Sequence, residues 1–188
     1  MGYVGGEAVK EYLGVTTTDD NTLIDHLIDR AGNIIEAYTG RVFKAETATK
    51  YFNTDNIEGR CLYLWGYDLL TITKLTNGNS VEITSDQYRL EPRNETPKYI
   101  VRLNEDYTWE FDDSDDEISI AGTWGYSTNL PLSIEHACIR LVAFLYRQKD
   151  TSSDVDRPLI TGDGVTIMPT NLPSDVRLML DGYKRRIA

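Results

Sequence analysis

The spacing of apolar residues changes period twice along this chain, and this change constrains the fold more than any other feature. From about Asp20 to Thr39 apolar side chains recur every three or four residues, which predicts an amphipathic helix. From about residue 47 short β-type runs alternate with turn residues, and a helical pattern returns after Pro131. This order predicts an α+β fold: a small helical bundle, with the long N-terminal helix packed on two C-terminal helices, interrupted by an antiparallel β-sheet insertion domain.

Local signals mark where these helices begin and end. A shorter helix from about Glu7 to Leu13 is expected to end at Gly14, and the long helix at Gly40, because glycine readily turns left-handed after a helix. Ser133 is the expected N-cap of the helix after Pro131. The last helix is expected to run from about Pro173 to the chain end. Cap oxygens for the long helix are expected from Thr18, Asp19 and Asp20.

The middle of the chain reads as a compact β block. Asn77-Gly78 lies between two of its runs and is a strong signal for a tight hairpin turn. The segment from Thr151 to Leu172 reads mostly as loop, with a small hairpin around Gly162 to Gly164. We therefore expect a helical core over residues 1–46 and 128–188 and a β insertion domain over 47–127. The expected strands lie at 50–52, 60–64, 70–75, 80–83, 87–90, 99–103 and 117–121.

Charge and hydropathy restrict the partners of the chain. Its 188 residues carry a formal net charge of -11, so its surface as a whole should repel nucleic acid and anionic membranes. The longest apolar runs, such as Leu141 to Leu145, are far shorter than the roughly 20 residues of a membrane span. Nothing at the N-terminus suggests export. Cys61 and Cys138, the only cysteines, are expected to be free and buried in a reducing compartment.

The residues needed for catalysis are scarce. His26 and His136 are the only histidines, and no Gly-x-Ser-x-Gly motif accompanies them. Clustered Cys and His ligands for zinc are missing, and Gly162-Asp163-Gly164 lacks the lysine of a phosphate-binding loop. We therefore expect no catalytic residue, no metal site and no cofactor, and a protein that is not an enzyme.

The acidic run at residues 110–117 is the sharpest local feature. It lacks the alternating ligands and central glycine of an EF-hand calcium loop, so a solvated hairpin tip is the favoured interpretation. A hydrolase using Asp112 or Asp115 as one of two catalytic carboxylates is a weaker hypothesis.

Aromatic residues are frequent in the β block. Most are expected to fill its core, while Trp65 and Trp109 lie near turn signals and are the expected exposed contacts. Exposed Trp and Tyr anchor protein and sugar partners. A carbohydrate- or protein-binding module carried by the β insertion is therefore the alternative function.

The chain ends on a basic segment, Tyr183-Lys184-Arg185-Arg186. Its positive charges suit the C-terminal dipole of a helix. The same charges would also let a terminal helix dock on an acidic neighbour. On the second interpretation, deleting residues 173–188 would abolish docking and leave a folded monomer.

Three stretches, in order, resemble the head–tail connector (adaptor, or head-completion) proteins of tailed bacteriophages. The first, Ala8 to Arg41, has a short helix, an acidic cap and a long helix that closes on Tyr38-Thr39-Gly40. The second is the strand ending Gly125-Tyr126, followed by Leu130-Pro131 and a helix. The third runs from Leu172-Pro173 to the Tyr-basic ending. The resemblance spans nearly the whole chain, although the β insertion matches least.

The resemblance implies a structural virion protein made in the host cytoplasm and located in the virion neck. Such proteins form rings, usually of twelve subunits, that bind the portal protein on one side and a head-closure (stopper) or tail protein on the other. DNA passes through the lumen without specific binding, which suits an acidic channel. The resemblance gives Tyr183, Lys184, Arg185 and Arg186 as the contact with the portal or a neighbouring subunit, and implies no membrane partner.

Overall fold

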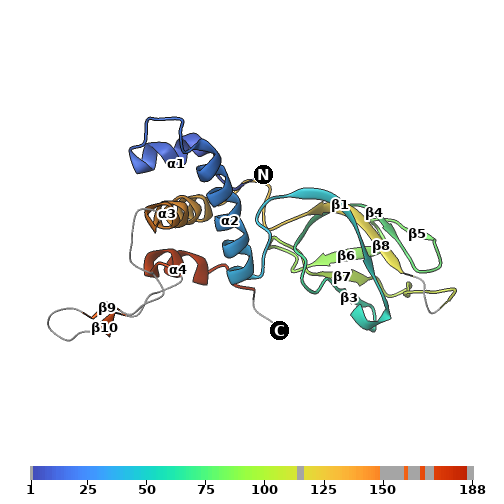
Figure 1. Cartoon of the computed structure of the whole chain (residues 1–188). Coiled ribbons are helices and arrows are strands. Elements are labelled where there is room, and N and C mark those ends of the chain that lie inside the picture. The colour runs from blue at the N-terminus through green and yellow to red at the C-terminus, as the bar shows by residue number, and fades with distance from the viewer. Residues whose placement is uncertain (1, 114–116, 149–158, 161–165, 168–171, 186–188) are drawn as a thin grey trace. The chain divides into compact units, whose positions relative to one another are not determined.

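The computed structural model describes residues 2–113, 117–148, 159–160, 166–167 and 172–185. The chain divides into two compact units: Met1–Gly40 together with Leu130–Ala188, and Arg41–Asn129. Within the described residues the first unit holds four α-helices and the second holds two four-stranded antiparallel sheets (Figure 1). The expectation of a mixed α+β fold is confirmed.

Helices α1 (Gly6–Leu13) and α2 (Asn21–Thr39) follow the expected signals closely. The glycines after them, Gly14 and Gly40, have φ of 72° and 68°, a left-handed conformation that other residues rarely adopt. Asp20 stands at the N-cap of α2, but its side chain makes no capping hydrogen bond. Its carboxylate instead accepts a hydrogen bond from Tyr146, so it joins α2 to the end of α3.

Helix α3 (Leu132–Gln148) contacts each of the other three helices, and α4 is Ser174–Asp181 (Figure 1). Helix α3 begins before Ser133, so this residue is not the N-cap that the sequence suggested. No helix in the described part of the chain is both long and apolar enough to cross a membrane. The apolar side chains of the helical unit with no exposed surface are Val9, Ala31, Ile35, Ile134, Ala137, Cys138, Leu141, Val142, Val176 and Leu180.

The last helix is shorter than expected, since α4 ends at Asp181 and residues 182–185 follow it as non-helical chain. Val176 and Leu180 of α4 are completely buried. Deleting residues 173–188 would therefore expose the core of the helical unit. We therefore now expect the deletion to unfold the helical unit, and no longer expect it to leave a folded monomer.

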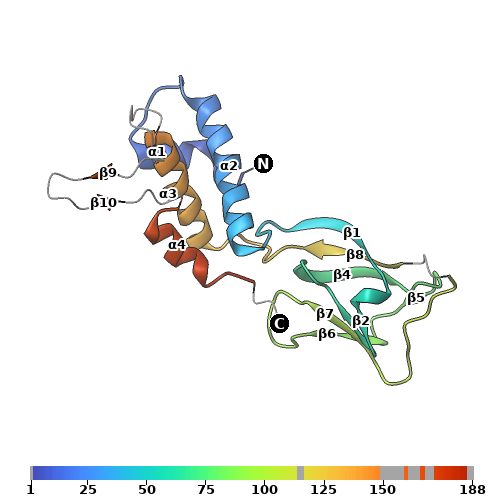
Figure 2. The same ribbon diagram turned by 60° about the horizontal axis from the view of Figure 1, so that its bottom comes forward.

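The second unit is built from two sheets with the strand orders β1-β8-β4-β5 and β2-β3-β7-β6. The sheets face each other across one apolar core that draws residues from both (Figure 2). This arrangement follows from alternation, because strands such as β8 show a strict buried–half-buried pattern. The strands are β1 Glu46–Phe52, β2 Ile57–Glu58, β3 Cys61–Tyr63, β4 Leu69–Thr76, β5 Glu82–Ile83, β6 Tyr88–Glu91, β7 Ile100–Leu103 and β8 Ile118–Trp124.

The expected hairpin at Asn77-Gly78 joins β4 to β5, but its left-handed residue is Ser80, with φ of 63°. Gly78 is needed for a different reason: a Cβ atom there would lie 2.3 Å from the Phe111 ring. The Asn79 amide NH2 group donates to Glu110 at 2.8 Å. These contacts hold the start of the acidic run beside β5, at the edge of the sheet β1-β8-β4-β5.

The expected hairpin near Gly162 is present as two short antiparallel strands, β9 (Leu159–Ile160) and β10 (Thr166–Ile167). Residues 161–165 between them lie outside the described residues.

Candidate interaction surfaces

The residues after α4 are held against the helical unit by hydrogen bonds. The Tyr183 hydroxyl lies 2.6 Å from the Ser133 hydroxyl at the start of α3. Arg185 donates from its backbone N–H to the Thr39 carbonyl at 2.9 Å, and from Nε to the Gly40 carbonyl at 3.1 Å. The C-terminal carbonyls of a helix lack hydrogen-bond partners within it. Arg185 therefore supplies donors to two carbonyls at the end of α2.

Lys184 is more exposed than its neighbours. Its ammonium lies 2.9 Å from Asp181 and 4.1 Å from the centre of the Tyr38 ring, a cation–π contact. Tyr38 donates a hydrogen bond to Asp181 at 2.7 Å. This hydrogen bond, followed by the one from Lys184, lowers the pKa of the Asp181 carboxyl. Tyr183, Lys184 and Arg185 therefore all have partners within the chain, and Arg186 lies outside the described residues.

The two tryptophans expected at the surface differ. Trp65 is 65% exposed and stacks near Tyr63, with ring centroids 5.9 Å apart. Trp109 is half-buried and packs against the core of the sheet unit, so the expectation that it is exposed is wrong. Its indole N–H is buried without a hydrogen-bond partner among the described residues. Proximity to a turn did not distinguish the two, because the turn beside Trp109 folds back onto the sheet.

The hydrolase hypothesis gains no support from the geometry. Asp112 and Asp113 are exposed, and Asp115 lies outside the described residues. His26 and His136 are both exposed, and His136 packs edge-on against Tyr12 with ring centroids 6.3 Å apart. Across the described ranges no three His, Cys, Asp or Glu side chains gather to hold a metal ion.

Both cysteines are free, as expected. Cys138 is fully buried in α3, and burial raises the pKa of its thiol to about 12. Cys61 is only half-buried, on β3, so the expectation of burial holds for one of the two.

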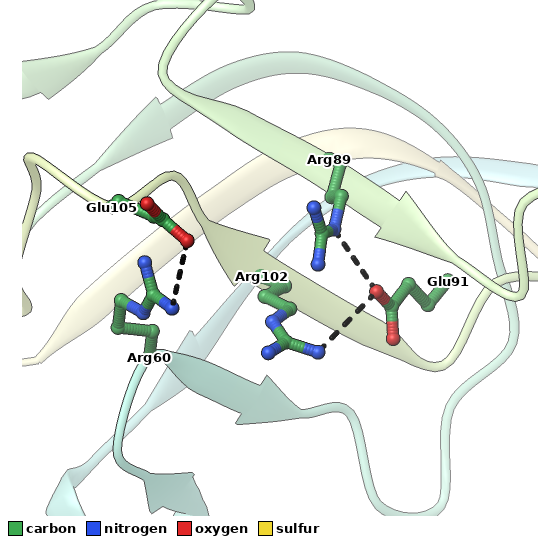
Figure 3. A network of polar contacts seen from close by, with 5 residues as sticks. All are labelled: Arg60, Arg89, Glu91, Arg102 and Glu105. Atoms are coloured by element: carbon green, nitrogen blue, oxygen red, sulfur yellow. Dashed lines mark hydrogen bonds and ion pairs between the residues drawn. The ribbon is translucent and has the colours of Figure 1, made fainter.

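Sequence reasoning missed a cluster of three arginines on the second sheet. Arg89 on β6 and Arg102 on β7 are directly opposite each other, and Arg60 immediately precedes β3 (Figure 3). Glu91 and Glu105 are their acidic partners. Alternation along the strands does indicate that Arg89 and Arg102 face away from the core, because each lies next to an apolar residue that faces it. Alternation does not show that the two arginines pair, since twelve residues lie between them.

A family model described as "HCP: Head completion protein" matches residues 4–186. None of the curated proteins matches the chain. Three solved chains with a similar fold come from structures described as "Neck of empty GTA particle computed with C6 symmetry", "Virion of native gene transfer agent (GTA) particle" and "Neck of native GTA particle computed with C12 symmetry".

These chains share the fold over almost their whole length, although few of their aligned residues are identical. The TM-scores are 0.66, 0.65 and 0.64, at 15%, 16% and 14% identity. The alignments cover 98%, 98% and 100% of this chain, and 91%, 91% and 95% of the others. Both units are therefore included in the match.

Proposed function

Because this chain belongs to the head completion protein family, we propose that it is a structural subunit of the neck of a phage-like particle. The observation that carries this proposal is the extent of the match. The family model spans residues 4–186, and the similar solved chains are aligned over at least 98% of this one. A protein whose role is to join other proteins acts through its surfaces, and it needs no catalytic constellation.

In the finer proposal, twelve copies form a ring that joins the portal to a head-closure (stopper) or tail protein. Two similar structures support this number for the particles they come from, since one neck was computed with C12 and another with C6 symmetry. A twelvefold ring satisfies both symmetries. The net charge of -11 suits a lumen through which DNA passes without being gripped.

We also propose that the sheet unit is an insertion into the helical core, as its central position in the chain suggests. The C-terminal segment keeps a proposed role at the portal or at a neighbouring subunit. Tyr183 and Arg185 would act indirectly there, by holding the segment against α2 and α3. Lys184, whose side chain is 45% exposed, would make the contact itself.

The test is cosedimentation with the portal protein of the same genome, followed by negative-stain imaging. A ring added to the portal is expected. Lys184→Glu should weaken binding, while Lys74→Glu on the sheet unit is a control with the same change of charge at an exposed lysine. A folded protein that leaves the portal bare at high concentration would refute the proposed function.

The alternative of a carbohydrate-binding module has one observation in its favour, the exposed Trp65 ring beside Tyr63. Specific binding on a glycan array, lost in Trp65→Ala, would be required to prefer it.

A further inference from the structure

The outer face of the sheet β2-β3-β7-β6 gathers arginine and aromatic side chains. Arg102 is paired with Arg89 on one side and with Cys61 on the other, and directly opposite residues in antiparallel strands project from the same face. Tyr63 is two residues beyond Cys61 and stacks near Trp65. The core side of these strands is taken by Leu62, Val101 and Leu103. We call the outer set, Arg60, Tyr63, Trp65, Arg89 and Arg102, the arginine–aromatic face.

The arginines of this face use few of their hydrogen-bond donors. Arg89 Nε lies 3.0 Å from Glu91, but Arg102 is 3.8 Å from Glu91 and Arg60 is 3.9 Å from Glu105 (Figure 3). The last two separations are ion pairs without hydrogen bonds. Arg102 Nε is buried and has no hydrogen-bond partner within the described ranges. A guanidinium carries five N–H donors, and the side chains of Arg60, Arg89 and Arg102 are 34%, 38% and 36% exposed. Their exposed nitrogens, which do not include Arg102 Nε, can therefore take up further acceptors.

Carboxylates on a protein are the acceptors that fit best. Arginine binds carboxylates through two parallel hydrogen bonds. Trp, Tyr and Arg together are the residue types that carry most of the binding energy in protein interfaces. Phosphate also suits arginine, so binding to duplex DNA is measured beside ring assembly.

This chain itself carries a suitable partner for the face. Six of the eight residues at 110–117 are acidic, and of these Asp112 and Asp113 are described and exposed. Glu110 accepts a hydrogen bond from Asn79 beside β5, so the run starts at the edge of one sheet while the arginines lie on the other. Two complementary patches at different places on one unit permit a head-to-tail contact, the kind that closes rings.

We propose that the arginine–aromatic face of one copy binds Asp112 and Asp113 of the next copy. The inference rests on the ring proposed above and assigns the surface that joins its subunits. In that contact Arg89 and Arg102 pair with the carboxylates, and Tyr63 and Trp65 supply the stacked, partly apolar area beside them.

A charge exchange tests the contact. Arg89→Glu with Arg102→Glu, and separately Asp112→Lys with Asp113→Lys, should each reduce ring assembly on the portal at least about tenfold. All four substitutions together should restore it. Arg30→Glu with Arg93→Glu is the matched control, because it changes the net charge equally at two exposed arginines outside the face.

Folding is checked separately for each variant. Glutamates beside Glu91 repel it, so Arg89→Gln with Arg102→Gln and the single change Trp65→Ser serve as milder variants. Trp65 is mostly exposed, so its replacement leaves the core intact. Near-ultraviolet circular dichroism of the remaining tryptophans reports whether the sheet unit is folded.

The outcomes separate this inference from the proposed function. Rings formed by every folded variant as by the wild type would overturn the contact and leave the neck function standing. A wild-type chain that forms no ring would overturn both the contact and the proposed function. Loss in the arginine variant without rescue by the exchange would overturn the acidic run as the partner. Normal rings with lost binding to duplex DNA at low salt would instead assign the face to nucleic acid.

Discussion

Leu180→Ala is expected to destabilise the helical unit selectively. Leu180 lies in α4 with no exposed surface, and the substitution removes three buried carbons. At about 0.8 kcal/mol per buried methylene this loss is roughly 2.4 kcal/mol, and the cavity raises the total to about 2–5 kcal/mol. We expect about 3 kcal/mol, because a helix of eight residues can shift to fill part of the space.

The two units allow the effect to be located. All three tryptophans, Trp65, Trp109 and Trp124, lie in the sheet unit, and the described α-helices lie in the other. In urea, circular dichroism at 222 nm therefore reports on the helical unit and tryptophan fluorescence on the sheet unit. Leu180→Ala should lower the urea midpoint measured by circular dichroism and leave the midpoint measured by fluorescence unchanged.

Leu178→Ala is the matched control, since Leu178 lies in the same helix and is 78% exposed. Its stability should stay within about 0.5 kcal/mol of the wild type. Equal losses from Leu178→Ala and Leu180→Ala would refute the assignment of the buried face of α4. Such a result would also remove the reason for expecting that deletion of residues 173–188 unfolds the helical unit.

Two further predictions concern titratable groups. Ellman's reagent at pH 8 should modify one thiol of the native protein, Cys61, and both in denaturant, because burial raises the pKa of Cys138 to about 12; two rapidly reacting native thiols would contradict this. Hydrogen bonding to Arg140 lowers the pKa of Asp175 in the folded state. Its stabilising contribution is therefore fully present above its ordinary pKa of about 3.9 and is lost progressively as pH falls from there through the lower folded pKa. The difference in melting temperature between wild type and Asp175→Asn should therefore shrink from pH 7 to pH 3, and a constant difference would count against the pair.

Helices and strands could be predicted because their signals are local. The apolar stripe of α2 and the glycine that follows it lie within twenty residues of each other, and alternation marks β8 within seven. Signals of the same kind did not predict where α4 ends. Its apolar spacing continues through Tyr183 to Ile187, yet the helix ends at Asp181, because Tyr183 and Arg185 bond to α3 and to the end of α2 instead.

The sequence by itself determined the order of elements, the amphipathic faces and the family resemblance, since each depends on residues near one another in the chain. Only the tertiary structure decided that Trp109 is half-buried while Trp65 is exposed. Only strand pairing brought Arg89 beside Arg102. The physical reason is that burial and register arise when distant segments bury their apolar faces together, and no local spacing specifies which segments meet.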